Sequence, residues 1–151
     1  MKILRAAEVD LREILDLQYR AYRSEAVLLN KFDIPPLKQN LADLQAEYRE
    51  KIFLKAVVDD AIIGSVRCQS AGDTVYIGKL IVEPNFQRRG IGTKLLLEVE
   101  KIFPRKRYEL FTSNKSVKNI SLYQRPGYKI FAEEAVAQDL TFVYLEKCPS
   151  R

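Results

Sequence analysis

The sequence predicts an α/β (α+β) fold in which about four helices flank a mixed, mostly antiparallel sheet of six to seven strands. Three strand-like segments at 51–58, 61–70 and 74–83 are separated by short polar turns, as in an antiparallel meander. An amphipathic helical segment at 91–103 lies between the third of these strands and the next one, at 107–112. Because a strand–helix–strand crossover returns the chain in the same direction, we expect these two strands to form a central parallel pair.

The N-terminal third is predicted to be mainly helical after a short strand at 2–6. Asp10 and Glu13 have the spacing of a capping box, at the start of a helix that runs to about residue 23. Residues 24–36 have no periodicity and end in a proline pair, after which a second helix is predicted to about residue 50. This loop is longer than packing requires, so either it carries function or it is disordered.

The C-terminal third is predicted to add one helix and two strands. Ser116 is a candidate N-cap for a helix through Tyr123, and Gly127 ends that helix. Strands at 128–134 and 140–146 complete the sheet.

The second and third meander strands carry more specific expectations. Alternation places Ile62, Gly64, Val66 and Cys68 on one face, so Cys68 is predicted to be a core thiol. Gly78 indicates either a β-bulge, which would splay its strand and free backbone groups for a ligand, or crowding against a core residue.

Composition favours a soluble globular protein with one domain, residues 1–151. The net charge of +5 favours anionic partners. No apolar run is as long as a membrane span, and the N-terminus lacks a signal-like apolar core, so we expect a cytoplasmic protein without a membrane partner. Cys68 and Cys148 fit no metal spacing and the chain has no histidine, so no metal site and no histidine-dependent catalysis are expected.

The strand, loop and helix between residues 76 and 103 have the features of an anion site. Gly90 and Gly92, at the beginning of the helix, allow a ligand to approach the backbone closely. The N–H groups of the first helical turn point outward with the positive end of the helix dipole. Donors and charge are added by Gln87, Arg88, Arg89 and Lys94. A pyrophosphate is therefore the group best suited to this site.

The glycine spacing excludes two common phosphate loops. A Walker loop requires a Gly-Lys-Ser/Thr run, whereas the order here is Gly92-Thr93-Lys94, and the third glycine of a dinucleotide fingerprint would fall at Leu95. The segment QRRGIG at 87–92, with LIVEP before it, resembles the Q/R-x-x-G-x-G/A signature and the L-x-V-x-P setting of the GNAT (GCN5-related) N-acetyltransferase superfamily. The resemblance extends over nearly the whole chain, and the predicted order of elements matches the GNAT topology.

The resemblance implies an acetyl-CoA-dependent N-acetyltransferase that moves an acetyl group directly from the coenzyme A thioester to a primary amine. Acetyl-CoA is then the donor substrate, and no metal takes part. The residues implied to bind it are Leu80, Ile81, Val82, Gln87, Arg88, Arg89, Gly90, Ile91, Gly92, Thr93, Lys94, Ser116, Asn119 and Tyr123. Backbone N–H groups at 80–82 would polarise the thioester carbonyl.

Two residues have catalytic roles by the same resemblance. The segment 116–128 is similar to the family pattern L-Y-x-x-x-G-F/Y, whose tyrosine commonly protonates the coenzyme A thiolate; here it is Tyr123, with a core tyrosine as the alternative. Family members usually have Asn seven residues before this tyrosine, where this chain has Ser116, with Asn119 four residues before. Glu109 occupies the position of a glutamate base in some members, and another carboxylate or water is the alternative base.

A second function class is a non-catalytic, basic nucleic-acid-binding module, which the net charge, Arg20, Arg23 and the basic run at 105–107 suggest. The basic residues are dispersed, however, and the aromatic residues fit core spacings instead of a stacking platform, so no nucleic acid is expected. The acceptor can be a small-molecule amine or a protein amine. The oligomeric state is left open, with a homodimer as one option.

Overall fold

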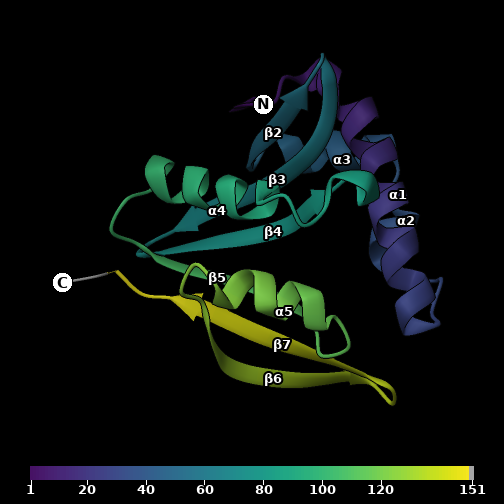
Figure 1. Ribbon diagram of the computed structural model, residues 1–151, viewed down its shortest axis with the longest axis vertical. Coiled ribbons are helices and arrows are strands. Elements are labelled where there is room, and N and C mark those ends of the chain that lie inside the picture. Colours follow the sequence, from purple (N-terminus) through teal and green to yellow (C-terminus); the bar gives the residue numbers. More distant parts are fainter. Residues whose placement is uncertain (150–151) are drawn as a thin grey trace.

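The computed structural model describes residues 1–149, which form a seven-stranded sheet in the order β1-β2-β3-β4-β5-β7-β6 (Figure 1). The strands are β1 (Lys2–Arg5), β2 (Ile52–Val58), β3 (Ala61–Ala71), β4 (Thr74–Val82), β5 (Arg107–Ser113), β6 (Lys129–Ala137) and β7 (Leu140–Lys147). The helices are α1 (Leu11–Leu29), α2 (Pro35–Lys38), α3 (Leu41–Tyr48), α4 (Ile91–Ile102) and α5 (Val117–Gln124), with 3-10 turns η1 (Glu8–Asp10) and η2 (Pro84–Phe86).

The sheet is mixed, as predicted. β4 and β5 run parallel, joined by the crossover through α4 (Figure 1). The other neighbouring strands pair antiparallel. The predicted parallel pair within a mostly antiparallel sheet is therefore confirmed.

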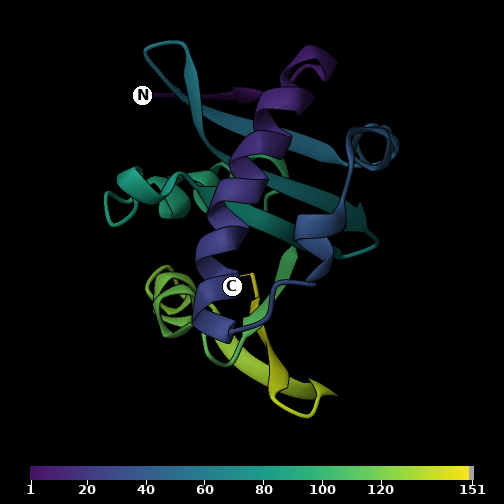
Figure 2. The same cartoon turned by 90° about the vertical axis from the view of Figure 1, so that its right-hand side faces the viewer.

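Helices cover both faces of the sheet, and each face has its own core. On one face, α1 and α3 pack against Phe53 and Ile81. On the other face, α4 and α5 pack against Leu54, Val66 and Cys68. Phe53 and Leu54 contribute to different cores because successive side chains point to opposite sides of a strand. Figure 2 shows α1 lying across the strands.

Cys68 is a core thiol, as predicted. Only 1% of the residue is exposed, and burial raises the pKa of its thiol to about 11, against a small opposing effect of Arg5. The thiolate that reacts with electrophiles is therefore scarce at neutral pH.

The first turns of α4 lie close to β3 because residue 64 is glycine. A Cβ atom there would lie 3.2 Å from Cδ1 of Leu95 and 3.3 Å from Cγ2 of Ile91. Such distances are shorter than ordinary van der Waals contact. Gly64 thus helps to set the position of the loop that precedes α4.

The structure corrects the predicted N-terminal helices. α1 continues to Leu29, because Ala26 and Leu29 are buried by residues distant in sequence, and it ends where Asn30 adopts a left-handed conformation. The connection to α2 is accordingly 30–34, shorter than the predicted loop at 24–36. The predicted second helix is divided into α2 and α3, and the side chain of Asn40 caps α3 by accepting the N–H of Asp43 at 2.8 Å.

The predicted capping box at Asp10 and Glu13 is also wrong, although the helix begins where expected. Asp10 accepts the N–H of Ala7 at 2.7 Å and pairs with Lys55 at 2.8 Å. Glu13 accepts the N–H of Ile62 at 2.8 Å. Both carboxylates therefore form tertiary or turn contacts that the helix pattern alone does not reveal.

A β-bulge in β3 changes the predicted alternation. Ala56 pairs with Gly64 and Val57 with Ile62, so Ile63 is an extra residue. Ile62 consequently packs with α1, while Ile63 joins Val66 and Cys68 on the α4 side. The prediction that Ile62 shares a face with Cys68 is wrong because one inserted residue reverses the alternation.

In the described part of the chain, no helix is long and apolar enough to cross a membrane. Residues 1–149 also contain no group of three or more His, Cys, Asp or Glu side chains that could hold a metal ion.

Candidate active site

The parallel strands β4 and β5 stay paired over a short distance only. Residues 74–76 pair with 107–109. Beyond them, β4 continues to Val82 beside β3, and β5 continues to Ser113 beside β7. We call the separated parts, residues 77–82 of β4 and 110–113 of β5, the β4–β5 splay.

A β-bulge lies within the splay. Gly78 pairs with Arg67 and Ile81 with Ser65, so Lys79 and Leu80 together face one residue of β3. Lys79 has φ 44°, the left-handed region that non-glycine residues rarely adopt. A Cβ atom on Gly78 would meet nothing within 4 Å, so the alternative of crowding at Gly78 is wrong and the predicted bulge is confirmed one residue later.

The glycine loop leads from the splay into α4. Gly90 is the N-cap of α4, with φ 79° and open space where a side chain would be. The first hydrogen bond of the helix runs from the N–H of Lys94 to the carbonyl oxygen of Gly90, at 3.0 Å. The N–H groups of residues 91–93 therefore have no acceptor inside the helix. The predicted donors Gln87, Arg88, Arg89 and Lys94 are exposed around this turn.

Gly92 has a packing role that was not predicted. It is buried, and a Cβ atom there would lie 3.1 Å from Cδ2 of Leu122 on α5 and 3.6 Å from Cδ2 of Leu80 at the bulge. The absence of a side chain thus lets α4, α5 and the bulge meet closely. A side chain at residue 90 would meet open space, whereas one at residue 92 would meet α5 and the bulge. The role of both glycines in ligand binding stays a prediction.

Tyr123 is both a core residue and a candidate acid. The residue is 6% exposed and belongs to the core that α4 and α5 share. Burial, with smaller contributions from Tyr22 and Glu25 of α1, raises the pKa of its phenol well above the ordinary value of 10.0. The hydroxyl is therefore protonated at neutral pH.

Ser116 and Asn119 lie on the same helix, before Tyr123. Ser116 is the N-cap of α5 by position, as predicted, but its hydroxyl makes no cap bond. That hydroxyl donates to Oε1 of Glu25, and the residue is 3% exposed. Asn119 Nδ2 contacts Oγ1 of Thr112 on β5 at 3.5 Å.

Glu109 lies where β5 still pairs with β4, opposite Tyr76. Its Oε1 accepts a hydrogen bond from Nη1 of Arg107 at 2.8 Å. Its neighbours Tyr108 and Leu110 belong to the core that contains Tyr123, so alternation directs Glu109 to the opposite face. The role of Glu109 as the base stays a prediction.

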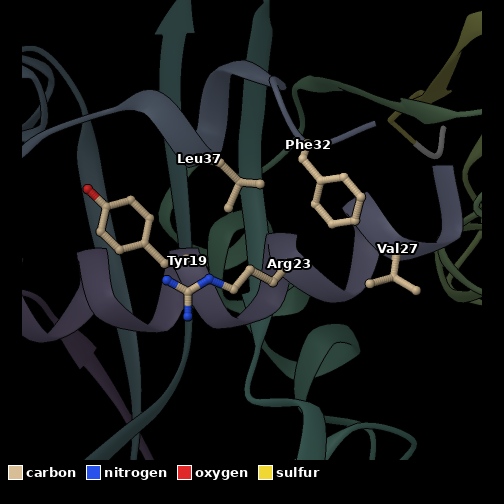
Figure 3. Close-up of a pocket in the computed structure, with 5 residues that line it drawn as sticks. All are labelled: Tyr19, Arg23, Val27, Phe32 and Leu37. Carbon is tan, nitrogen blue, oxygen red and sulfur yellow. The ribbon is translucent and has the colours of Figure 1, made fainter. Parts of the chain in front are cut away.

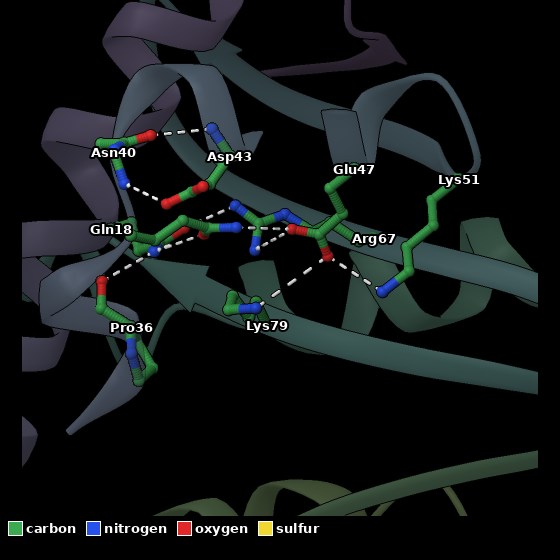
Figure 4. A network of polar contacts seen from close by, with 9 residues as sticks. Gln18, Pro36, Asn40, Asp43, Glu47, Lys51, Arg67 and Lys79 are labelled. Carbon is green, nitrogen blue, oxygen red and sulfur yellow. Dashed lines mark hydrogen bonds and ion pairs between the residues drawn. The ribbon is translucent and has the colours of Figure 1, made fainter. Parts of the chain in front are cut away.

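A buried polar network on the α1 side of β3 and β4 was not predicted (Figure 4). Arg67 is 1% exposed, although it reads as a surface residue of an alternating strand. It donates to Oε1 of Gln18, its Nη1 lies 3.4 Å from Oε1 of Glu47, and its guanidinium lies 4.8 Å from the centre of the Phe53 ring. The sequence carries no signal for this network, because an arginine between the core positions Val66 and Cys68 has the pattern of a strand with one exposed face.

Glu47 holds the network together. Its Oε2 lies 2.9 Å from Nζ of Lys51 and 3.9 Å from Nζ of Lys79, in addition to the contact with Arg67. Burial lowers the pKa of Lys79, Arg67 lowers it further, and Glu47 opposes both. One carboxylate of α3 therefore fixes a buried cation of β3 and the left-handed Lys79 of the bulge.

A pocket lies beside α1, at the connection to α2 that the sequence left open. Its volume is about 420 Å³, and Tyr19, Arg23 and Val27 of α1 line it together with Phe32 and Leu37 (Figure 3). The lining is mainly apolar, with Arg23 as its charged group. This pocket is on the α1 side of the sheet.

Comparison with known sequences identifies relatives of this chain. The model of the acetyltransferase (GNAT) family matches residues 9–128. The UPF0157 protein YqkA of Bacillus subtilis (strain 168) is 27% identical over 141 residues, which are 93% of this chain and 40% of the relative. The spermidine N(1)-acetyltransferase of Thermoplasma acidophilum is 28% identical over 82 residues, 52% of this chain and 51% of the relative. These matches thus span about half the length of the curated relatives, or less.

Comparison with solved structures shows the same fold. The crystal structure of the PaiA N-acetyltransferase of Thermoplasma acidophilum in complex with coenzyme A has a TM-score of 0.81 and 19% identity, over 97% of this chain and 98% of that one. Other solved structures with this fold contain coenzyme A or acetyl-CoA. Because the family model also covers most of the chain, the protein belongs to the acetyltransferase (GNAT) family.

Proposed function

We propose that residues 1–151 act as one acetyltransferase domain, which moves an acetyl group from acetyl-CoA directly to the primary amine of an acceptor. The observation that carries this proposal is the meeting of three elements at the splay. Gly92 brings the first turn of α4 against both Leu80 of the bulge and Leu122, the residue before Tyr123. The first turn of α4, the bulged end of β4 and the part of α5 that carries Tyr123 therefore lie side by side, which supports the proposed roles in anion binding, carbonyl polarisation and proton donation.

The α4 turn fits the pyrophosphate of coenzyme A. Its N–H groups at 91–93 lack helical acceptors, and Gly90 leaves their approach open. The exposed side chains of Arg88, Arg89 and Lys94 supply positive charge that matches a diphosphate. Gln87, Thr93, Ser116 and Asn119 stay proposed contacts.

Acetyl-CoA, when bound, supplies a thioester whose thiol titrates near 8.5, so the thiolate departs readily and a proton donor increases the rate further. Backbone N–H groups at 80–82 are proposed to polarise the carbonyl, and Tyr123 to protonate the sulfur. The acceptor amine must lose a proton before it can attack the carbonyl, because an alkyl amine with a pKa of about 10.4 is neutral in only a few parts per ten thousand at pH 7.

The acceptor belongs to the class of primary amines, either a small molecule or a protein amine. Spermidine is the first compound to test, because a relative bears the name of an acetyltransferase for it. A cytoplasmic location stays a prediction from the sequence.

Acetyl-CoA is expected to raise the melting temperature. A ligand that binds only the folded protein stabilises it by RT ln(1 + [L]/Kd), about 2.7 kcal/mol at a hundredfold excess over Kd. Differential scanning fluorimetry with acetyl-CoA, desulfo-coenzyme A and a short RNA measures this directly. A shift with RNA and none with millimolar acetyl-CoA would favour the nucleic-acid-binding alternative.

Gly90→Val is expected to abolish acetyl-CoA binding in a protein that still folds. A branched side chain would occupy the open space through which the pyrophosphate reaches the backbone. The left-handed conformation adds a strain of about 1–2 kcal/mol. Calorimetric titration with acetyl-CoA is the measurement.

Gly72→Val is the matched control for this strain. Gly72 has φ 62° and open space around it, but it lies in the turn between β3 and β4. The control should lose similar stability and keep its affinity for acetyl-CoA. Equal affinities of the Gly90→Val and Gly72→Val variants would remove the glycine loop from the binding site.

A further inference from the structure

Glu25 of α1 reaches a helix on the other face of the sheet. α1 packs in the core with Phe53 and Ile81, whereas α5 contributes Tyr123 to the opposite core. Nevertheless, the hydroxyl of Ser116, at the start of α5, donates a hydrogen bond to Oε1 of Glu25. A contact between helices on opposite faces is possible here because β4 and β5 no longer pair with each other at this end.

The stripe of α1 that carries Glu25 is half-buried. Gln18 and Leu29, seven residues before and four residues after Glu25, are buried, and Tyr22 lies one turn before it. Burial is the main cause of the raised pKa of Tyr22 and of Tyr123, and the charge of Glu25 raises both pKa values further, so this carboxylate is close to both phenols. The groups that face this carboxylate are therefore two phenols and the hydroxyl of Ser116.

The other carboxylates near the site are already paired with cations. Glu83 lies 2.7 Å from Arg20. Glu109 lies 2.8 Å from Arg107. Glu47 belongs to the network with Arg67. Glu25, in contrast, forms no ion pair with any residue of the described chain, 1–149.

We propose that Glu25 binds the ammonium group of the acceptor at the splay and accepts its proton. This inference rests on the proposed function, and it assigns the basic role to Glu25 instead of Glu109. A carboxylate without a cation, held by one hydroxyl beside the proposed acid, is suited to a cationic amine. Ser116 acts as a positioning residue, because its hydroxyl orients the carboxylate.

The proton balance of the reaction is complete with these groups. The ammonium gives one proton to Glu25, which releases it to solvent. The neutral nitrogen forms a bond to the acetyl carbon, the bond from that carbon to sulfur breaks, and Tyr123 gives its proton to the sulfur. The second proton of the nitrogen then restores the Tyr123 phenol, and the products are the acetamide and the free thiol.

Glu25→Gln is the decisive variant, because it keeps the size of the side chain and an acceptor for Ser116 while it removes the charge. At pH 7, kcat/KM for an alkyl amine should fall by about 10²- to 10⁴-fold. The defect should shrink as pH rises towards the amine pKa of about 10.4, where the free amine no longer needs a base. It should be small at every pH for a weakly basic amine, which is neutral at pH 7.

Three further variants complete the experiment. Ser116→Ala should give a smaller loss with the same dependence on pH, and Glu133→Gln, an exposed carboxylate on β6, should behave as wild type. Calorimetric titration should show unchanged affinity of Glu25→Gln for acetyl-CoA. Wild-type kcat/KM in Glu25→Gln, or a pH-dependent loss in Glu109→Gln alone, would overturn the inference and leave the proposed function intact. A wild-type protein that binds no acetyl-CoA and acetylates no amine would contradict both.

Discussion

Glu47→Ala is expected to lower the free energy of unfolding by about 3–5 kcal/mol, since it removes one partner of a buried ion pair. The Arg67 side chain is 2% exposed, so its charge cannot be solvated when the carboxylate is lost. Lys79 would lose its counter-ion at the same time. Urea-induced unfolding, followed by circular dichroism, is the measurement.

Two controls separate this effect from an ordinary surface substitution. Lys51→Ala removes a partner of Glu47 whose side chain is 31% exposed, and it should cost roughly 0–1 kcal/mol. Arg67→Met combined with Glu47→Leu should recover much of the stability, because the fully buried charge of Arg67 is removed together with its partner, while Lys79, with a side chain 28% exposed, stays in contact with solvent. A Glu47→Ala variant as stable as Lys51→Ala would show that the network does not stabilise the fold.

The same pair makes the fold sensitive to acid. Burial alone would raise the pKa of Glu47, but Arg67, Gln39, Lys51 and Lys79 outweigh it, so the pKa lies below the ordinary value of 4.5. A carboxyl group with a lowered pKa stabilises the folded state above its unfolded pKa. That contribution is lost as the pH falls from about 4.5 through the lower folded value.

Tyr123→Phe is expected to lower kcat by roughly tenfold to a thousandfold and to leave the affinity for acetyl-CoA nearly unchanged. Under the proposed function, the hydroxyl acts only as the sulfur departs, so its loss affects the transition state and not the bound ground state. Phenylalanine keeps the ring within the core that buries Tyr123. Steady-state kinetics and calorimetry with acetyl-CoA test both halves of this expectation.

Tyr128→Phe is the matched control for Tyr123→Phe. Tyr128 is 1% exposed in the same core, and its hydroxyl donates to Oε2 of Glu100 at 3.2 Å. Its replacement should reduce stability slightly and leave kcat unchanged. An acyl donor with a more acidic thiol should also reduce the defect of Tyr123→Phe. Unchanged turnover of Tyr123→Phe, with chemistry rate-limiting, would leave the phenol a core group only.

The features that depend on neighbouring residues could be predicted from the sequence. Asp59-Asp60 and Gly72 have the left-handed conformations that tight turns require. The turns of the meander could therefore be predicted from these residue types. Gly90 was likewise recognisable as a position that leaves the backbone open, and a side chain there would meet nothing within 4 Å. These signals are local, because a turn or a cap is decided by a few consecutive residues.

The features that depend on distant residues could not be predicted in this way. α1 extends to Leu29 because other parts of the chain bury Ala26, and the residues after position 23 show no helical pattern by themselves. Arg67 is internal because α3 supplies Glu47 and α1 supplies Gln18. Glu109 lies on the face of β5 opposite to the core that contains Tyr123. The pairing of β5 with β4 and β7 determines which side chains face that core, and this pairing exists only in the folded sheet.

The separation of β4 from β5 has a consequence for the order of events during turnover. Under the proposed function, the donor enters from the α4 side of the sheet and the acceptor from the α1 side, so neither obstructs the path of the other. Both substrates can occupy the enzyme together, and the acetyl group needs no temporary protein carrier. Cys68 would serve poorly as such a carrier in any case, because burial raises the pKa of its thiol to about 11. Initial-rate kinetics with both substrates varied should then follow a ternary-complex pattern, with intersecting instead of parallel reciprocal plots.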